Sequence, residues 1–181
     1  MHYSNIKYCD IADGEGVRTT LFVSGCRRHC KNCFNPETWS FLAGEEFTKS
    51  VEDSIIESME PFYVDGLTVL GGEPFEPENQ AVLVDFLERV KERYPDKTIW
   101  AFTGDQYEDI VSGSKHTDYS DRMLACIDVL VDGEFIEELH DITLRFCGSS
   151  NQRVIDLNKT REKGEVTLWN DDPLFASHAT F

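Results

Sequence analysis

Three cysteines, Cys26, Cys30 and Cys33, lie within eight residues of the chain and form a CxxxCxxC pattern. Thiolates bind iron–sulfur clusters and zinc, and such short spacings let successive sulfurs on one loop converge on the same group. No fourth cysteine lies nearby in the sequence. Four cysteines would saturate an iron–sulfur cluster, whereas three leave one iron open to a substrate or cofactor. The pattern therefore predicts a cluster with an open coordination site, which suits catalysis.

Structural zinc is the alternative that the spacing leaves open, with His29 or another residue as fourth ligand in a non-catalytic interaction module. The charge around the loop favours metal-binding thiolates in either case. Residues 16–36 contain no Asp or Glu but carry four cations, Arg18, Arg27, Arg28 and Lys31. Positive neighbours lower the pKa of a thiol and so favour the thiolate. We expect this +4 segment to mark the working site of a chain whose net charge is −17.

A second candidate site is the run Gly71, Gly72, Glu73 and Pro74. Two glycines permit close backbone approach, and backbone carbonyls or Glu73 can accept hydrogen bonds from an ammonium group. A plain strand-to-helix turn would use the same residue types. Three further polar residues at or after predicted strands could contact a cofactor or simply belong to a strand end, a turn or a polar loop: Thr103, Asp132 and Asn151.

The elements that must position these residues follow from the apolar pattern. Four near-continuous apolar runs predict strands buried on both faces, at residues 19–23, 67–70, 98–102 and 127–131. One helix follows candidate N-caps at 48–50 and has the apolar stripe Val51, Ile55, Ile56, Met59 and Phe62. Another begins near Pro77 and has the stripe Leu83, Phe86, Leu87, Val90 and Tyr94. We expect both stripes to lie in the core.

Weaker signals complete the chain. A helix is predicted over 106–126 with a break at 112–114, and short strands at 144–146, 153–155 and 166–169. The alternation of strands and helices predicts an α/β fold with a mostly parallel sheet and outer helices. A complete eight-unit barrel takes roughly 250 residues, so 181 residues leave room for only a partial (β/α) barrel. Because functional loops follow the C-terminal ends of parallel strands, the cysteine loop and segment 71–74 should share one edge of the sheet.

Composition limits the class of protein. A hydrophobic fraction of 40% is typical of a globular domain, and we expect a single domain over 1–181 with a less certain tail at about 159–181. The 34 acidic against 17 basic residues disfavour binding to nucleic acid or to an anionic membrane. No stretch suits a membrane helix or a signal peptide, so the expected location is the cytoplasm. The remaining cysteines are expected to be free thiols: Cys9, Cys126 and Cys147.

The cysteine pattern on a loop after the first predicted strand resembles the radical S-adenosylmethionine superfamily. An ordered set of further motifs is similar to the activating proteins of anaerobic ribonucleotide reductase. These motifs are GEGVR at 14–18, LFVSGC at 21–26, CFN at 33–35, TW at 38–39, GGEP at 71–74, IW at 99–100, TG at 103–104, VLVDGEF at 129–135 and GSSNQR at 148–153. The resemblance extends over about residues 3–156.

The resemblance implies a cofactor pair and a partner. In such proteins three cysteines, here Cys26, Cys30 and Cys33, hold a [4Fe-4S] cluster, and S-adenosylmethionine chelates the fourth iron. The reduced cluster splits the cofactor into methionine and a 5′-deoxyadenosyl radical. That radical then takes hydrogen from a glycine of the anaerobic ribonucleoside-triphosphate reductase catalytic subunit and leaves a glycyl radical there. A flavodoxin or a ferredoxin-type protein would donate the electron.

The resemblance also implies cofactor contacts. The segment Gly71, Gly72, Glu73 and Pro74 would bind the methionine amino group, and Asn32, Cys33 and Phe34 would lie beside the adenine. Thr103, Asp132 and Asn151 are candidates for further contacts. Two positions depart from the family pattern: Cys147 stands where an arginine is common, and Asp105 stands where a tyrosine often follows Thr-Gly. An activase of another glycyl radical enzyme, such as pyruvate formate-lyase, is the alternative function within the same chemistry.

Overall fold

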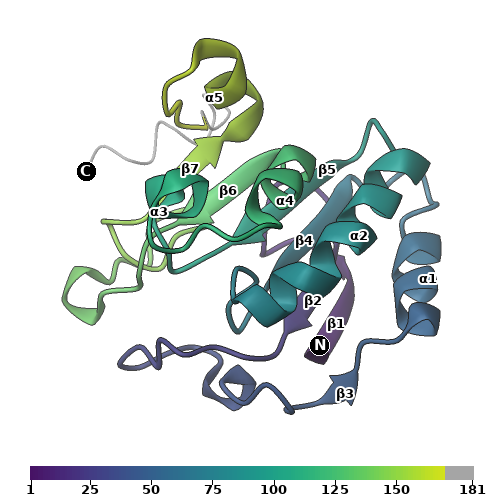
Figure 1. Ribbon diagram of the computed structural model, residues 1–181, viewed down its shortest axis with the longest axis horizontal. Coiled ribbons are helices and arrows are strands. Elements are labelled where there is room, and N and C mark those ends of the chain that lie inside the picture. The colour runs from purple at the N-terminus through teal and green to yellow at the C-terminus, as the bar shows by residue number, and fades with distance from the viewer. Residues whose placement is uncertain (170–181) are drawn as a thin grey trace.

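The computed structural model describes residues 1–169 of the chain. Within these residues seven strands form one sheet in the order β3-β1-β2-β4-β5-β6-β7 (Figure 1). The strands are β1 (His2–Asp10), β2 (Arg18–Val23), β3 (Glu45–Glu46), β4 (Gly66–Gly71), β5 (Thr98–Phe102), β6 (Val129–Asp132) and β7 (Arg153–Asp156). The helices are α1 (Lys49–Ser58), α2 (Pro77–Arg93), α3 (Tyr107–Ser112), α4 (Ser120–Cys126) and α5 (Leu157–Lys163), with two 3-10 helices, η1 (Pro36–Thr38) and η2 (Glu137–Leu139).

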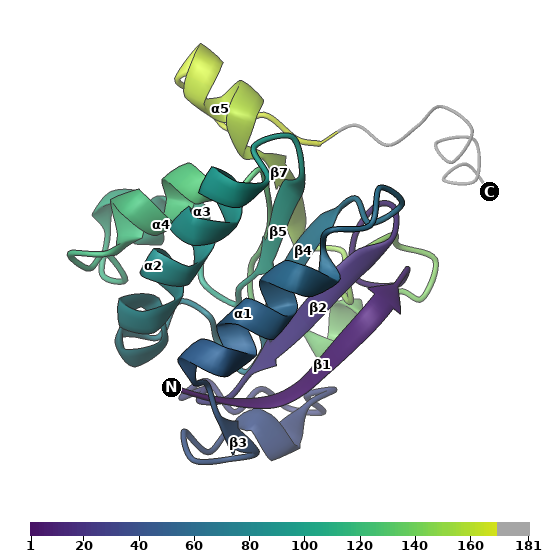
Figure 2. The ribbon, with the colours of Figure 1, turned by 90° about the vertical axis from the view of Figure 1, so that its right-hand side faces the viewer.

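The centre of the sheet consists of four parallel strands, β2, β4, β5 and β6. They correspond to the four strands that the apolar runs predict, which confirms that part of the expectation. The helices α1, α2, α3 and α4 lie between these strands in the sequence and pack together on one face of the sheet (Figure 2). The α/β class with outer helices is therefore confirmed, and the partial barrel stays a prediction.

Antiparallel strands flank this centre on both sides. β1 pairs with β2 and with β3, and β7 pairs with β6. Only β7 has a counterpart among the predicted strands. β1 was missed because its sequence, HYSNIKYCD, has no continuous apolar run, and each of its residues is at least partly exposed. A strand near the edge of a sheet does not need to be apolar on both faces.

Two other predicted strands are wrong. Residues 144–146 form no strand, and Phe146 has a φ of 63°, which lies in the left-handed region and cannot continue a strand. Residues 166–169 contribute only an isolated bridge, between Leu168 and Ile155. The predicted helix over 106–126 is interrupted as expected, but the break between α3 and α4 runs from 113 to 119 and is wider than the predicted one.

The main core lies between the sheet and the helices. Alternate strand residues such as Leu21, Val69 and Ala101 point to this side, as the two-residue period of a strand requires. They meet Ile55 of α1, Met59 directly after that helix, and the α2 stripe of Leu83, Phe86, Leu87 and Val90. The α1 cap is Thr48, whose side chain accepts a hydrogen bond from the Val51 amide. The expectation for Phe62 is wrong, because α1 ends at Ser58 and the Phe62 side chain is 96% exposed.

A second, smaller core lies on the opposite face of the sheet. Trp100, Val129 and Val131 pack there against Phe146 and Trp169. The Trp100 and Trp169 ring centroids are 5.3 Å apart, and the Trp169 amide donates to the Val154 carbonyl. The described end of the chain thus packs on the sheet. The expected tail covers about residues 159–181, and its residues 170–181 lie outside the described part of the chain. No helix within 1–169 is long and apolar enough to cross a membrane.

Candidate functional site

The cysteine loop leaves β2 at Val23 and is fastened to the following turn. Gly25, with a φ of +103°, donates to the Thr38 carbonyl at 2.7 Å, and the Cys26 amide donates to the Trp39 carbonyl at 3.1 Å. An alanine at Gly25 would place its Cβ 2.3 Å from the Phe41 ring. The glycine is therefore required both by its backbone conformation and by the close approach of Phe41.

The three thiols of this loop line one cavity of about 400 Å³ at the C-terminal ends of the parallel strands. The face of the sheet away from the helices supplies Phe22, Leu70 and Phe102, which are apolar. Most of the remaining wall comes from the end of β4 and the loops after β4, β5 and β6, including Gly71, Gly72, Glu73, Thr103, Gly104, Gly133 and Phe135. The cysteine loop and the segment 71–74 thus share one edge of the sheet, as the strand order predicted.

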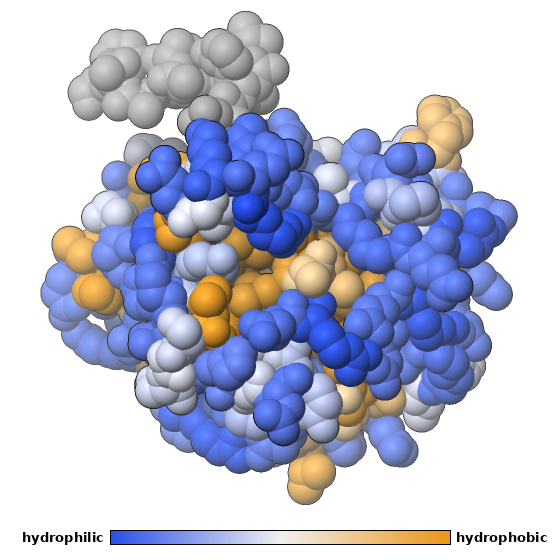
Figure 3. Space-filling model, turned by 45° about the horizontal axis from the view of Figure 1, so that its top comes forward, coloured by the Kyte–Doolittle hydropathy of each residue, from blue (hydrophilic) through white to orange (hydrophobic). Residues whose placement is uncertain are grey.

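A second hollow, of about 170 Å³, lies between α3, α4 and α5 and is lined in part by Val111, Leu124 and Leu157. Apolar surface by itself does not single out a functional site, since Figure 3 shows apolar surface exposed in the middle of a largely hydrophilic face of the molecule. None of the cysteines of the CxxxCxxC pattern lines this hollow. We therefore take the larger cavity as the candidate site.

The structure brings together only part of the predicted cofactor residues. Phe34, Gly71, Gly72, Glu73 and Thr103 line the cavity together with the three cysteines. Four others are not part of its lining: Asn32, Pro74, Asp132 and Asn151.

Each of these four has another environment in the structure. Asn32 is exposed on the loop, with a φ of 56°. Asp132 is fully buried and accepts hydrogen bonds from the Tyr107 amide and the Arg153 guanidinium. The side-chain amide of Asn151 donates to the Glu134 backbone carbonyl. Pro74 lies in the turn between β4 and α2.

Gly71 and Gly72 place the turn after β4 directly against the cysteine loop. The Gly72 amide donates to the Val23 carbonyl at 2.8 Å, and the Glu73 amide donates to the Gly25 carbonyl at 2.9 Å. A Cβ on Gly72 would lie 2.6 Å from the Gly25 carbonyl oxygen. The glycines therefore allow two backbones to meet where a side chain would separate them.

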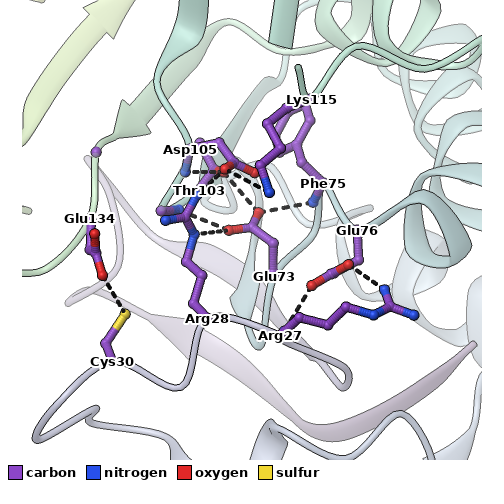
Figure 4. A network of polar contacts seen from close by, with 12 residues as sticks. Arg27, Arg28, Cys30, Glu73, Phe75, Glu76, Thr103, Asp105, Lys115 and Glu134 are labelled. Carbon is purple, nitrogen blue, oxygen red and sulfur yellow. Dashed lines mark hydrogen bonds and ion pairs between the residues drawn. The ribbon is translucent and has the colours of Figure 1, made fainter. Parts of the chain in front are cut away.

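Glu73 is buried at the base of this turn and its carboxylate is already occupied. Oε1 accepts from the Thr103 hydroxyl at 2.8 Å and from the Phe75 amide at 3.0 Å, and Oε2 accepts from the Gly104 amide at 2.9 Å (Figure 4). Burial raises the pKa of Glu73, and these donors oppose that shift. The carboxylate thus joins the ends of β4 and β5.

The expected positive charge of the cysteine loop is not realised. Arg18 lies at the opposite end of β2, where it is 1% exposed and donates to Thr68 and to the Leu67 carbonyl. The other three cations are each paired with carboxylates: Arg27 with Glu76 and Glu78, Arg28 with Glu73 and Asp105, and Lys31 with Glu138. Acidic residues distant in the sequence therefore cancel the local charge.

The expectation of lowered thiol pKa values is wrong for two of the cysteines. Burial raises the pKa of Cys26. Burial and then the nearby Glu134 carboxylate raise the pKa of Cys30, whose Sγ lies 3.8 Å from Glu134 Oε1. Binding a metal group at these thiols would therefore displace protons.

The sequence did not reveal several residues of the cavity wall. Lys7 of β1 and Asp13 from the following loop lie 3.7 Å apart at the cavity, and Phe135 packs on Phe34 with ring centroids 5.3 Å apart. Lys7 and Asp13 had no signal, because they reach the cavity only through the unpredicted strand β1. Phe135 lies inside the VLVDGEF motif, which could have suggested it.

The donor set fits an iron–sulfur cluster better than a closed zinc site. Three thiols face one cavity, and thiolates are the ligands that such clusters take. His29, the candidate fourth zinc ligand, is not part of the lining and stacks on Trp39 with ring centroids 4.4 Å apart. Within residues 1–169 no three His, Cys, Asp or Glu side chains are gathered into a metal-binding set, so the thiols share a wall rather than a closed site.

Comparison with known proteins agrees with this assignment. A family model described as a 4Fe-4S single cluster domain matches residues 12–155. The anaerobic ribonucleoside-triphosphate reductase-activating protein of Haemophilus influenzae is 43% identical over 154 residues, which cover 84% of this chain and 96% of that protein. The chain belongs to this family of activating proteins. The activating proteins of Escherichia coli K12 and of Enterobacteria phage T4 are each 36% identical, covering 85% of this chain and 97% and 93% of their own lengths.

The match to the 4Fe-4S family model covers every residue of the cavity lining except Lys7. The matched segment 12–155 contains the three cysteines, the turn after β4 and Phe135. All of β1 and all of α5 lie outside it.

Proposed function

We propose that this chain activates an anaerobic ribonucleotide reductase by reductive cleavage of S-adenosylmethionine at a [4Fe-4S] cluster held by Cys26, Cys30 and Cys33. The observation that carries the proposal is that these three thiols and the turn after β4 face one cavity. The family model for a 4Fe-4S domain and the names of the relatives support it.

Different residues of the cavity would bind the cluster, the amino group and the adenine. The three thiols are the candidate cluster ligands. The Glu73 carboxylate is already occupied by Thr103 and by backbone amides, so backbone carbonyls at Gly71 and Gly72 are the better candidates to accept hydrogen bonds from the cofactor's amino group. Phe34, 68% exposed at the cavity, offers an apolar face for the adenine.

The cavity would also protect the reaction. When bound, the cluster and S-adenosylmethionine supply a 5′-deoxyadenosyl radical that takes hydrogen from a glycine of the reductase. Phe22, Leu70 and Phe102 line the sheet side of the cavity with apolar surface, which disfavours water near the cofactor.

The partner follows from the relatives. They are named as activating proteins of anaerobic ribonucleoside-triphosphate reductase, and this chain covers nearly their full length. We propose the catalytic subunit of that reductase as partner, a flavodoxin or ferredoxin-type protein as electron donor, and the cytoplasm as location. An activase of pyruvate formate-lyase is less well supported, because the relatives named here activate the reductase.

One mixing experiment tests the proposal. The reconstituted protein is incubated anaerobically with S-adenosylmethionine, a reductant and the reductase, and the mixture is examined by electron paramagnetic resonance. We expect a glycyl radical signal on the reductase and formation of 5′-deoxyadenosine. Cleavage without a radical on the reductase would reject this partner but keep the chemistry. Stoichiometric zinc without labile sulfide in the anaerobically purified protein would reject the chemistry itself.

A further inference from the structure

Arg28 lies between Cys26 and Cys30 and connects the cysteine loop to two strand ends. Its Nη2 donates to Oδ1 of Asp105, which follows β5, and its Nε lies 3.6 Å from Oε2 of Glu73, which follows β4 (Figure 4). The Asp105 and Glu73 side chains are 5% and 4% exposed, so water screens these contacts little. One guanidinium thus tethers the loop to β4 and β5.

The two carboxylates that Arg28 contacts, Glu73 and Asp105, are held in place by further polar contacts. Thr103 connects the Glu73 carboxylate to the backbone of Asp105, because its hydroxyl donates to Glu73 and accepts from the Asp105 backbone amide at 3.0 Å. The Lys115 ammonium lies 3.5 Å from Asp105 Oδ1 on the side away from the loop. A buried carboxylate pair held in this way can fix the position of the residue that it binds.

The neighbouring Arg27 provides a contrast within the same loop. It pairs with Glu76 and Glu78 near the start of α2, its side chain is 57% exposed, and it is not part of the cavity lining. Arg28 lines the cavity and its side chain is 21% exposed. The two arginines therefore pair with different carboxylates, and of the two only Arg28 lines the cavity.

We propose that Arg28 and Asp105 act as one positioning pair for S-adenosylmethionine. By clamping the cysteine loop against β4 and β5, the pair keeps the thiols in register with the backbone of Gly71 and Gly72. This inference rests on the proposed function and extends it to two residues outside the cysteine pattern. Neither residue touches the reacting atoms. Both act through the loop.

The physical reason is that the cofactor would have to contact two elements at once. Its chelating groups would reach the cluster on the cysteine loop, and its amino group would reach the turn after β4. If the loop is free to move, it must be ordered when S-adenosylmethionine binds, and the free-energy cost of ordering it weakens cofactor binding. The cluster ligands lie on the loop alone, so iron binding depends less on the clamp. Loss of the pair should therefore weaken cofactor binding more than cluster binding.

The test measures S-adenosylmethionine binding to reconstituted protein with the cluster left oxidised, so that no cleavage occurs. For Arg28→Gln and for Asp105→Asn we expect the Kd to rise by about tenfold to a hundredfold. Iron and sulfide per chain should stay near those of the unchanged protein. The double variant should bind no more weakly than the weaker single variant, because both changes open the same clamp. For Arg28→Lys we expect a Kd between those of the unchanged protein and Arg28→Gln, since lysine keeps the charge but not the planar guanidinium.

Arg27→Gln is the matched control, because it removes an arginine with two ion pairs from the same loop. We expect its Kd to stay within about twofold of the unchanged protein, as exposed ion pairs contribute little. An unchanged Kd in both Arg28→Gln and Asp105→Asn would reject the proposed positioning pair. A double variant whose rise in Kd equals the product of the two single rises would also reject it, because the two residues would then act independently. Loss of iron in both single variants would also overturn it, because the pair would then serve cluster binding. If the unchanged protein itself fails to bind S-adenosylmethionine, the proposed function fails instead.

Discussion

The Thr103 hydroxyl donates a 2.8 Å hydrogen bond to Oε1 of Glu73 and so joins the end of β5 to the turn after β4. Both side chains are buried, and the same hydroxyl accepts from the Asp105 amide. Two strands that are separate in the sequence thus share one polar contact at the cavity. The contact has a direct consequence for stability.

Replacing Thr103 by valine should lower the free energy of unfolding by about 1–3 kcal/mol, because the buried Glu73 carboxylate loses a donor and the Asp105 amide loses its acceptor. Chemical denaturation of the two proteins measures the difference. Thr103→Ser keeps the hydroxyl and is the control, with a smaller expected loss. Equal stability of the valine and serine variants would contradict the role of the hydroxyl.

Changing any one of Cys26, Cys30 or Cys33 to alanine should abolish formation of 5′-deoxyadenosine, because a cluster with an open iron would lose one of its three ligands. Anaerobic incubation with S-adenosylmethionine and reductant, followed by chromatography, measures the product. Cys9→Ser is the control, since Cys9 is exposed and does not line the cavity. Undiminished product from all three alanine variants would refute the ligand assignment.

Gly71→Ala should destabilise the protein more than Gly164→Ala. Both glycines have positive φ, of 111° and 72°, so both substitutions carry a conformational cost of about 1 kcal/mol. Only at Gly71 does the new Cβ also collide, 2.7 Å from the Val23 carbonyl oxygen, whereas nothing lies within 4 Å at Gly164. Thermal unfolding of the two variants compares the costs. A larger loss at Gly164 would show that the close approach of β2 and β4 is unimportant.

Stability should depend on pH through Asp13. Burial and the adjoining Asp10 carboxylate raise the pKa of Asp13 from 3.8 to about 6. The folded protein then binds more protons than the unfolded chain between about pH 4 and pH 6, so this group lowers the free energy of unfolding as the pH rises through that window. Asp13→Asn should remove this part of the pH dependence and stabilise the protein at pH 7. Denaturant titrations from about pH 4 to pH 8 test this, and parallel curves for both proteins would contradict it.

Several residues show where reasoning from the sequence reached its limit. Arg18 was grouped with the cysteine loop because it is near in sequence, yet β2 has six residues and spans about 20 Å, which puts Arg18 at the other end. Phe62 continues the helical stripe of α1, but the helix ends four residues earlier. Asp105 was visible only as a departure from a family pattern. Its pairing with Arg28 depends on the meeting of two loops 77 residues apart.

Features that depend on near neighbours in the chain follow from the sequence alone. The cysteine spacing, the apolar runs of the four central strands and the Thr48 and Pro77 helix starts are local, and local sterics and hydrophobic burial decide them. The tertiary structure alone decided which charges meet, that β1 and β7 run antiparallel, and that Glu73 is occupied by Thr103. These depend on contacts between distant segments, because a buried charge or an open strand edge is satisfied by whichever group the packed fold brings to it.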